Sequence, residues 1–217
     1  MDTIIFWAFA VAYVALIILL GVRHKKVRLS SVLFLVLIAL VYDNLMINSG
    51  RFIGKGDLLQ TLNFGRFWLH ALFTPTLIIF SIAILQEASV AWVNTKVAIT
   101  LTALLFLVAI VIEFMTELNG LTLAPTEAYG ALSYSSVEET TGPPFMILVM
   151  LIALLIAACT LTKLFQWWWM LIGAIVMTIG SAVPIDIQSN AITNLFELFL
   201  LFTLVLTQKH FNKQNFI

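Results

Sequence analysis

Seven apolar segments, each close to the length of a membrane-crossing helix, divide this sequence from end to end. They fall at about 3–22, 29–48, 66–86, 96–117, 145–164, 167–184 and 189–207. A helix rises about 1.5 Å per residue, so about 20 apolar residues cross the hydrocarbon core of a bilayer. Inside that core a helix pairs all of its own backbone polar groups. The pattern therefore predicts an all-α integral membrane protein, a seven-transmembrane helix bundle.

Composition supports the membrane class and leaves little chain for anything else. Of the 217 residues, 62% are hydrophobic and 10% are charged, whereas soluble domains carry about 25% charged residues. We therefore expect residues 1–217 to form a single polytopic membrane domain. The formal net charge is zero, and no basic stripe with interleaved aromatic residues indicates a nucleic-acid partner.

The distribution of lysine and arginine predicts the orientation, because basic connections stay on the cytoplasmic side. Eight of the eleven basic residues fall in connections on one side of the membrane. These residues are Arg23, Lys25, Lys26, Arg28, Lys96, Lys163, Lys209 and Lys213. The bias places the N-terminus outside and the C-terminus in the cytoplasm. The sequence has no Asn-x-Ser/Thr glycosylation site, which favours a prokaryotic plasma membrane, with an organellar membrane as the alternative.

Two predicted outer connections are longer than a simple turn. Residues 49–65 contain several glycines, but their spacing does not match a phosphate-binding loop, so a flexible surface loop is the better interpretation. Residues 118–144 run from Asn119 to a Gly-Pro-Pro sequence at Gly142. Connections of this length are lids or binding loops, or else disordered.

Polar residues inside the predicted helices gather at one depth. They are Asp43 and Asn44 in the second segment, Arg66, His70 and Thr74 in the third, Glu113 in the fourth, and Asn190, Asn194 and Glu197 in the seventh. All of these positions fall in the outer half of the membrane. We expect one outward-facing polar pocket enclosed by the second, third, fourth and seventh segments. The first, fifth and sixth segments would then be lipid-facing support.

Ionised side chains in hydrocarbon are costly, so residues of this kind mark functional sites unless they are paired. We assign catalytic roles to His70, Glu113, Glu197 and Asp43, and substrate-binding roles to Arg66, Asn44, Asn190, Asn194 and Thr74. Some of them have plainer interpretations. Helix-end residues such as Arg66 and Asn190 reach headgroups, and Asn194 can form a structural interhelical hydrogen bond.

These residues favour cofactor-free acid–base chemistry, of isomerase, cyclase or hydrolase type, on a lipid or isoprenoid-like substrate. A retinal-binding lysine in the last segment and a multi-histidine zinc site are both missing from the pattern. A divalent metal held by Asp43, His70, Glu113 and Glu197 remains an alternative ligand, and we expect no other cofactor. The alternative functions are a small proton- or cation-coupled transporter or leak channel, and a ligand-binding sensor or assembly subunit.

Overall fold

A computed structural model describes residues 2–21, 28–128, 130–137, 145–182 and 191–214 of the chain. Its main helices, in chain order, are α1 (Asp2–Gly21), α2 (Leu33–Ile53), α3 (Asp57–Phe73), α4 (Thr76–Glu87), α5 (Lys96–Glu113), α6 (Phe145–Phe165), α7 (Trp169–Ala182) and α8 (Ala191–Gln214). Shorter elements are the 3₁₀ turns η1 (Leu29–Val32) and η2 (Ala91–Asn94), the π-helical turn η3 (Phe114–Leu118), and the strands β1 (Leu123–Ala128) and β2 (Ala131–Ser136).

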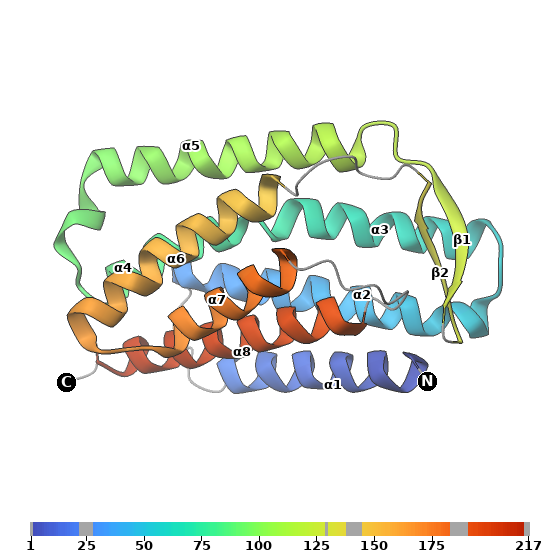
Figure 1. Cartoon of the computed structure of the whole chain (residues 1–217), viewed down its shortest axis with the longest axis horizontal. Helices are drawn as coiled ribbons and strands as arrows, with labels where there is room; N and C mark the ends of the chain where they lie inside the picture. The colour runs from blue at the N-terminus through green and yellow to red at the C-terminus, as the bar shows by residue number, and fades with distance from the viewer. Residues whose placement is uncertain (1, 22–27, 129, 138–144, 183–190, 215–217) are drawn as a thin grey trace.

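The helices form an elongated bundle whose axes run roughly along its long dimension (Figure 1). Helix α1 packs against α2 and α8 along one edge, while α5 lies along the opposite edge and packs against α4 and α6. Helix α7 packs between α6 and α8. The outward faces of α1 and α5 carry exposed apolar side chains such as Val11, Leu104 and Val111. Such faces suit contact with lipid chains.

Six helical stretches among the described residues are long and apolar enough to cross a membrane, which is compatible with the predicted multi-pass helical membrane protein. They are Ile4–Gly21, Leu29–Ile53, Asp57–Glu87, Lys96–Leu118, Phe145–Phe165 and Ala191–Asn212. The remaining predicted segment forms α7, which has 14 residues and is therefore roughly 21 Å long, short of the roughly 30 Å core. Whether α7 crosses, and with it the seven-span topology and its orientation, stays a prediction.

The prediction of a flexible loop at 49–65 is wrong. Helix α2 continues to Ile53, and α3 already begins at Asp57, so that the turn between them is only Gly54–Gly56. Gly54 adopts a positive φ of 82° and donates its N–H to the Gly50 carbonyl at 2.8 Å, which ends α2. Polar residues and glycines at the ends of two helices produced a loop-like composition, although most of the segment is helical.

The third span is divided in two by a proline. Helix α3 ends at Phe73 and α4 begins at Thr76, with Thr74 and Pro75 forming the turn between them. Pro75 has no N–H, so the carbonyl of Ala71 loses its helical hydrogen bond at this point. Leu77 and Ile78 instead donate to the carbonyls of Thr74 and Pro75 at 3.1 and 2.9 Å. The single helix predicted at 66–86 is therefore two helices that together begin at Asp57 and end at Glu87.

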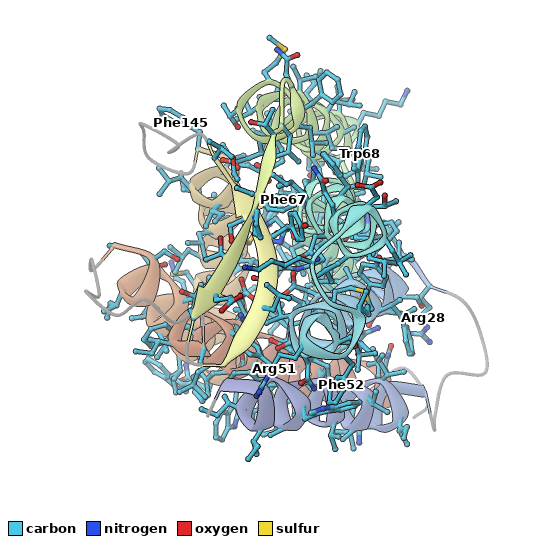
Figure 2. All side chains as sticks on the ribbon, turned by 90° about the vertical axis from the view of Figure 1, so that its right-hand side faces the viewer. Arg28, Arg51, Phe52, Phe67, Trp68 and Phe145 are labelled. Atoms are coloured by element: carbon cyan, nitrogen blue, oxygen red, sulfur yellow. The ribbon has the colours of Figure 1, made fainter. Side chains whose placement is uncertain are left out.

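The second long connection contains a β-hairpin, so that the fold is mostly but not wholly helical. Strands β1 and β2 pair antiparallel, from Leu123 opposite Ser136 to Ala128 opposite Ala131. Figure 2 shows the hairpin crossing one end of the bundle, where β2 packs against α2 and α3. Close approach requires Gly50, because a Cβ atom there would collide with the carbonyl of Leu132. Of the predicted loop, residues 129 and 138–144 lie outside the described part of the chain.

Candidate functional site: an amphipathic cavity between α2, α3 and α8

A cavity opens inside the bundle near the break between α3 and α4. It holds about 560 Å³ of space between side chains, counting its open mouth. Its polar lining residues are Asp43, Arg66, His70, Thr74 and Glu197. Its apolar lining residues are Val36, Ala39, Leu40, Leu77, Ile147, Met150, Met177, Leu200 and Leu201. The cavity therefore has the mixed lining that suits a ligand with both a polar group and an apolar chain.

Helical periodicity explains how α3 contributes three polar groups to one cavity. Arg66, His70 and Thr74 are each four residues apart, so they lie on one face of α3 on successive turns. This polar stripe extends about 12 Å along the helix. It ends at the turn made by Thr74 and Pro75.

Arg66 and Asp43 form the strongest polar contact of the cavity. Arg66 Nε donates to Asp43 Oδ1 at 2.8 Å, and the two side chains are only 12% and 24% exposed. Arg66 also donates through an Nη atom to Asn63 Oδ1 at 2.8 Å. The guanidinium is thus held at two points, by α2 and by its own helix. Charge-assisted bonds of this kind fix geometry as well as adding stability.

Glu197 and His70 lie on α8 and α3, and both are within electrostatic range of the Asp43 carboxylate. Within the described part of the chain, neither side chain makes a hydrogen bond or an ion pair. Both are half-buried, and both line the cavity. Two titratable groups that lack protein partners and face a common space are available to a bound molecule.

The structure brings some of the predicted site residues together and separates others. Asp43, Arg66, His70, Thr74 and Glu197 line the cavity, whereas Glu113 is not among its lining residues. Glu113 is buried at the end of α5, and Glu117, whose charge acts on it, follows one turn later in η3. The predicted enclosure by the fourth segment is therefore wrong. Helices α6 and α7, expected to be lipid-facing support, supply Ile147, Met150 and Met177 to the cavity instead.

Asn44 and Asn194 meet beside the cavity without being among its lining residues. Asn44 Nδ2 donates to Asn194 Oδ1 at 3.0 Å and to the Leu40 carbonyl at 2.8 Å. Both side chains are buried, with 0% and 6% exposure. The contact is an interhelical bond between α2 and α8, as the plainer interpretation of Asn194 expected. Asn190 lies outside the described residues.

Sequence reasoning missed Asn63, which connects the cavity to the hairpin. Asn63 is fully buried, donates to the Leu59 carbonyl at 2.7 Å and accepts from the Tyr134 N–H at 3.2 Å. The same Oδ1 atom accepts from Arg66. Tyr134 also accepts a hydrogen bond from the Gly56 N–H through its hydroxyl, at 3.1 Å. Asn63 was missed because it falls in the segment predicted to be a loop, although its spacing of three from Arg66 was available as a signal.

Metal binding gains no support from the described residues, which include no group of three or more His, Cys, Asp or Glu side chains able to hold an ion. The mixed site considered from the sequence would need Glu113 beside Asp43, His70 and Glu197, and Glu113 does not line their cavity.

Comparison of the chain with protein-family models, with curated proteins and with solved structures finds no match in any of the three.

Proposed function

We propose that this protein is a membrane enzyme that carries out cofactor-free acid–base chemistry on a lipid or isoprenoid-like substrate in the cavity. The observation that carries the proposal is the convergence of Glu197, His70 and the Asp43–Arg66 pair on a space whose other walls are apolar. An amphiphilic molecule would place its chain against Ile147, Met150 and Met177. Its polar group would then lie among the titratable side chains.

Each polar residue has a distinct role in this proposal. Glu197 and His70 exchange protons with the substrate, because they have no protein hydrogen-bond partner among the described residues and share the same space. Arg66 orients a polar or anionic group of the substrate, while Asp43 and Asn63 hold the guanidinium in place. Thr74 offers a further hydroxyl at the end of the α3 stripe. Glu113, Asn44 and Asn194 do not line the cavity, so in this proposal they do not contact the substrate.

The proposed setting is a plasma membrane of prokaryotic type, with the hairpin end of the bundle outside. The cavity residues Asp43 and Arg66 lie on the portions of α2 and α3 that lead to the hairpin. The opposite end of the bundle carries Arg28, Lys96 and Lys163, as cytoplasmic connections do. Substrate would reach the cavity from the outer half of the bilayer.

Isotope transfer from water tests the proposal whatever the chemical identity of the substrate. The purified protein is placed in nanodiscs with total lipid extract from the expression host, in D₂O or in H₂¹⁸O. Mass spectrometry then follows every lipid. Isomerase or cyclase chemistry transfers deuterium from solvent to one lipid, and hydrolysis transfers ¹⁸O. The expected result is label in one lipid class with the wild-type protein.

Two glutamates, one at the cavity and one away from it, provide matched variants for this experiment. Glu197→Gln removes a carboxyl that lines the cavity, whereas Glu113→Gln removes one that does not. We expect labelling to be lost with Glu197→Gln and with His70→Ala, and to persist with Glu113→Gln. Labelling that is absent with the wild-type protein, or unchanged by Glu197→Gln, would contradict the proposal.

A second candidate function is proton- or cation-coupled transport, which one observation favours. A second polar cluster, made by Ser30, Glu87 and Gln208, lies at the end of the bundle away from the hairpin. Ser30 Oγ donates to Glu87 Oε1, and Gln208 Nε2 donates to Ser30 Oγ at 2.8 Å. Gln208 and Glu197 are eleven residues apart, which places them on one face of α8 at a separation of about 16 Å along its axis.

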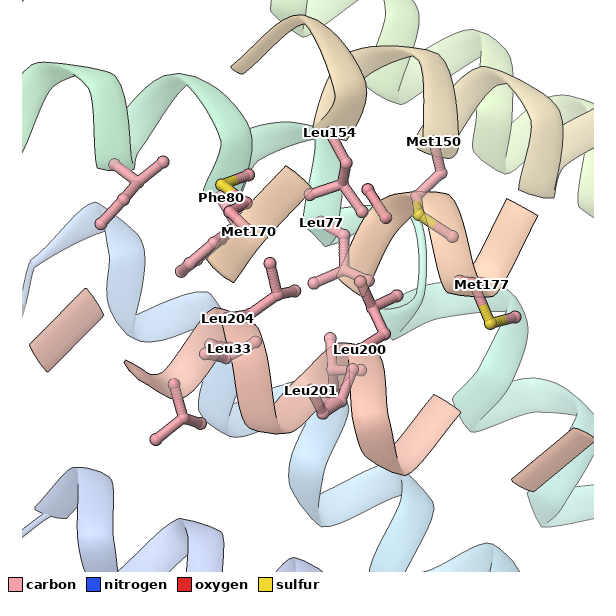
Figure 3. Close-up of a cluster of buried hydrophobic side chains, with 14 of the residues drawn as sticks. Leu33, Leu77, Phe80, Met150, Leu154, Met170, Met177, Leu200, Leu201 and Leu204 are labelled. Atoms are coloured by element: carbon pink, nitrogen blue, oxygen red, sulfur yellow. The ribbon is translucent and has the colours of Figure 1, made fainter. Parts of the chain in front are cut away.

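Between the two polar clusters lies an apolar layer. Figure 3 shows the labelled side chains Leu33, Leu77, Leu201 and Leu204 within it, and each of these is at most 2% exposed. A closed transport pathway has this arrangement, with polar sites toward both faces and an apolar barrier in the middle. Proton flux into proteoliposomes, measured with an internal pH-sensitive dye, tests this function. Flux that requires both Glu197 and Glu87 would favour transport over the enzyme.

A further inference from the structure

A row of buried polar side chains lies between α1, α2 and α8, beside the cavity. Asn48 is completely buried, and neither Nδ2 nor Oδ1 of its amide has a hydrogen-bond partner among the described residues. Asn44, one turn along the same face of α2, also has an unpartnered Oδ1 atom. Unsatisfied amide atoms are costly in a membrane interior, so three of them on one helix face require an explanation.

The row continues from these two asparagines to the acidic residues. Asn44 Nδ2 donates to Asn194 Oδ1 at 3.0 Å, and the main-chain carbonyl of Asn194 accepts from the Tyr13 hydroxyl at 3.3 Å. Tyr13 is itself fully buried, and the charges of Glu197 and Asp43 both act on its side chain. Because Asn194 and Glu197 are three residues apart on α8, these polar groups form a row from Asn48, toward the hairpin end of α2, to Glu197 at the cavity.

We propose that Asn48, Asn44, Asn194 and Tyr13 hold a short file of water molecules that carries protons between the hairpin end of the bundle and Glu197. Water matches the unpartnered atoms, because it donates to the two Oδ1 atoms and accepts from Asn48 Nδ2. A proton that enters the file is passed from one water to the next and ends as the O–H of the Glu197 carboxyl. When Glu197 loses its proton, the same bonds form and break in reverse.

Other occupants fit the row less well. A metal ion would be attracted by the two Oδ1 atoms but repelled by the Asn48 N–H donors, and neither of the two unpartnered side chains is a carboxylate. A lipid chain would leave all three atoms unsatisfied. Of these three occupants, only water supplies both a donor and an acceptor.

This inference depends on the proposed function only in that Glu197 exchanges protons, and its test needs no substrate. Infrared spectroscopy of the protein in nanodiscs detects the C=O stretch of protonated Glu197 as the band that Glu197→Gln removes. The pH is lowered until this band is fully developed, and the sample is then transferred to D₂O. The rate at which the band shifts reports how fast solvent exchanges protons with Glu197.

We expect Asn48→Leu and Tyr13→Phe to slow this exchange by about tenfold or more, as the loss of one hydrogen-bonded link implies. Ser49→Ala is the matched control. Its hydroxyl donates to the Leu45 carbonyl at 2.6 Å on an adjacent face of α2, outside the row, so exchange should keep its wild-type rate. Leucine resembles asparagine in size and leaves no unpaired amide, so Asn48→Leu should fold. Tyr13→Phe provides an independent second variant.

Wild-type exchange rates in both variants would overturn the proposal. Slow exchange in Tyr13→Phe alone would also overturn it, because protons would then reach Glu197 without passing Asn48. If exchange is slower in both variants but the wild-type protein never transfers isotope to a lipid, the water file is supported and the proposed enzyme function is refuted.

Discussion

Removing Asp43 should destabilise the protein far more than removing a carboxylate from an equally short ion pair on the surface. In Asp43→Ala, the Arg66 guanidinium, 12% exposed, keeps only its bond to Asn63. Breaking a fully buried pair costs about 3–5 kcal/mol, and the 24% exposure of Asp43 toward the cavity reduces this through partial solvation. We expect the free energy of unfolding to fall by about 2–4 kcal/mol.

The Lys55–Glu127 pair offers the comparison. Its N–O distance is 2.9 Å, against 2.8 Å for Arg66 and Asp43, but its side chains are 58% and 65% exposed. Solvent screens a pair of this kind, so Glu127→Ala should cost about 0–1 kcal/mol. Because the two distances are nearly equal, burial is the main difference between the two pairs, and the two variants compare its effect on stability.

Reversible unfolding by sodium dodecyl sulfate in mixed micelles, followed by tryptophan fluorescence, gives both free energies. A double variant, Asp43→Leu with Arg66→Met, should recover much of the loss, because it leaves no unpaired charge. Equal destabilisation by Asp43→Ala and Glu127→Ala would refute the reasoning, as would a double variant less stable than Asp43→Ala.

Three further predictions concern the backbone and the bundle interior. Gly50→Ala should release the hairpin and lower stability by about 1–3 kcal/mol in the same unfolding assay, whereas Gly21→Ala, with open space around its Cβ position, should not. Thr207→Val should cost about 1–2 kcal/mol, because the Trp167 Nε1–H loses its acceptor at 2.9 Å; an unchanged unfolding midpoint would count against this. Pro75→Ala should restore the helical hydrogen bond to the Ala71 carbonyl and so close the break between α3 and α4 near the cavity. The purified variant should then retain less lipid per protein than the wild type, as measured by mass spectrometry.

The sequence was sufficient to predict the long apolar helices and to select the polar residues that line the cavity. Apolar segment length and the cost of buried charge operate at the level of single segments, so no tertiary information was needed for Asp43, His70 or Glu197. The errors arose where composition was ambiguous. Residues 49–65 resemble a loop because glycines and charges cluster at two helix ends. Asn63 lies in this segment and was therefore not recognised as a residue of the site.

Only the tertiary structure decided which polar residues share a space. Glu113 and Glu197 have similar sequence environments and similar predicted depth, yet one lies on α5 beside Glu117 and the other in the cavity. Depth along a helix follows from sequence, but the direction in which each helix turns its polar face depends on how the helices pack. That packing is set by contacts between residues far apart in the chain, such as Asn44 with Asn194 and Arg66 with Asp43, which helical periodicity alone does not specify.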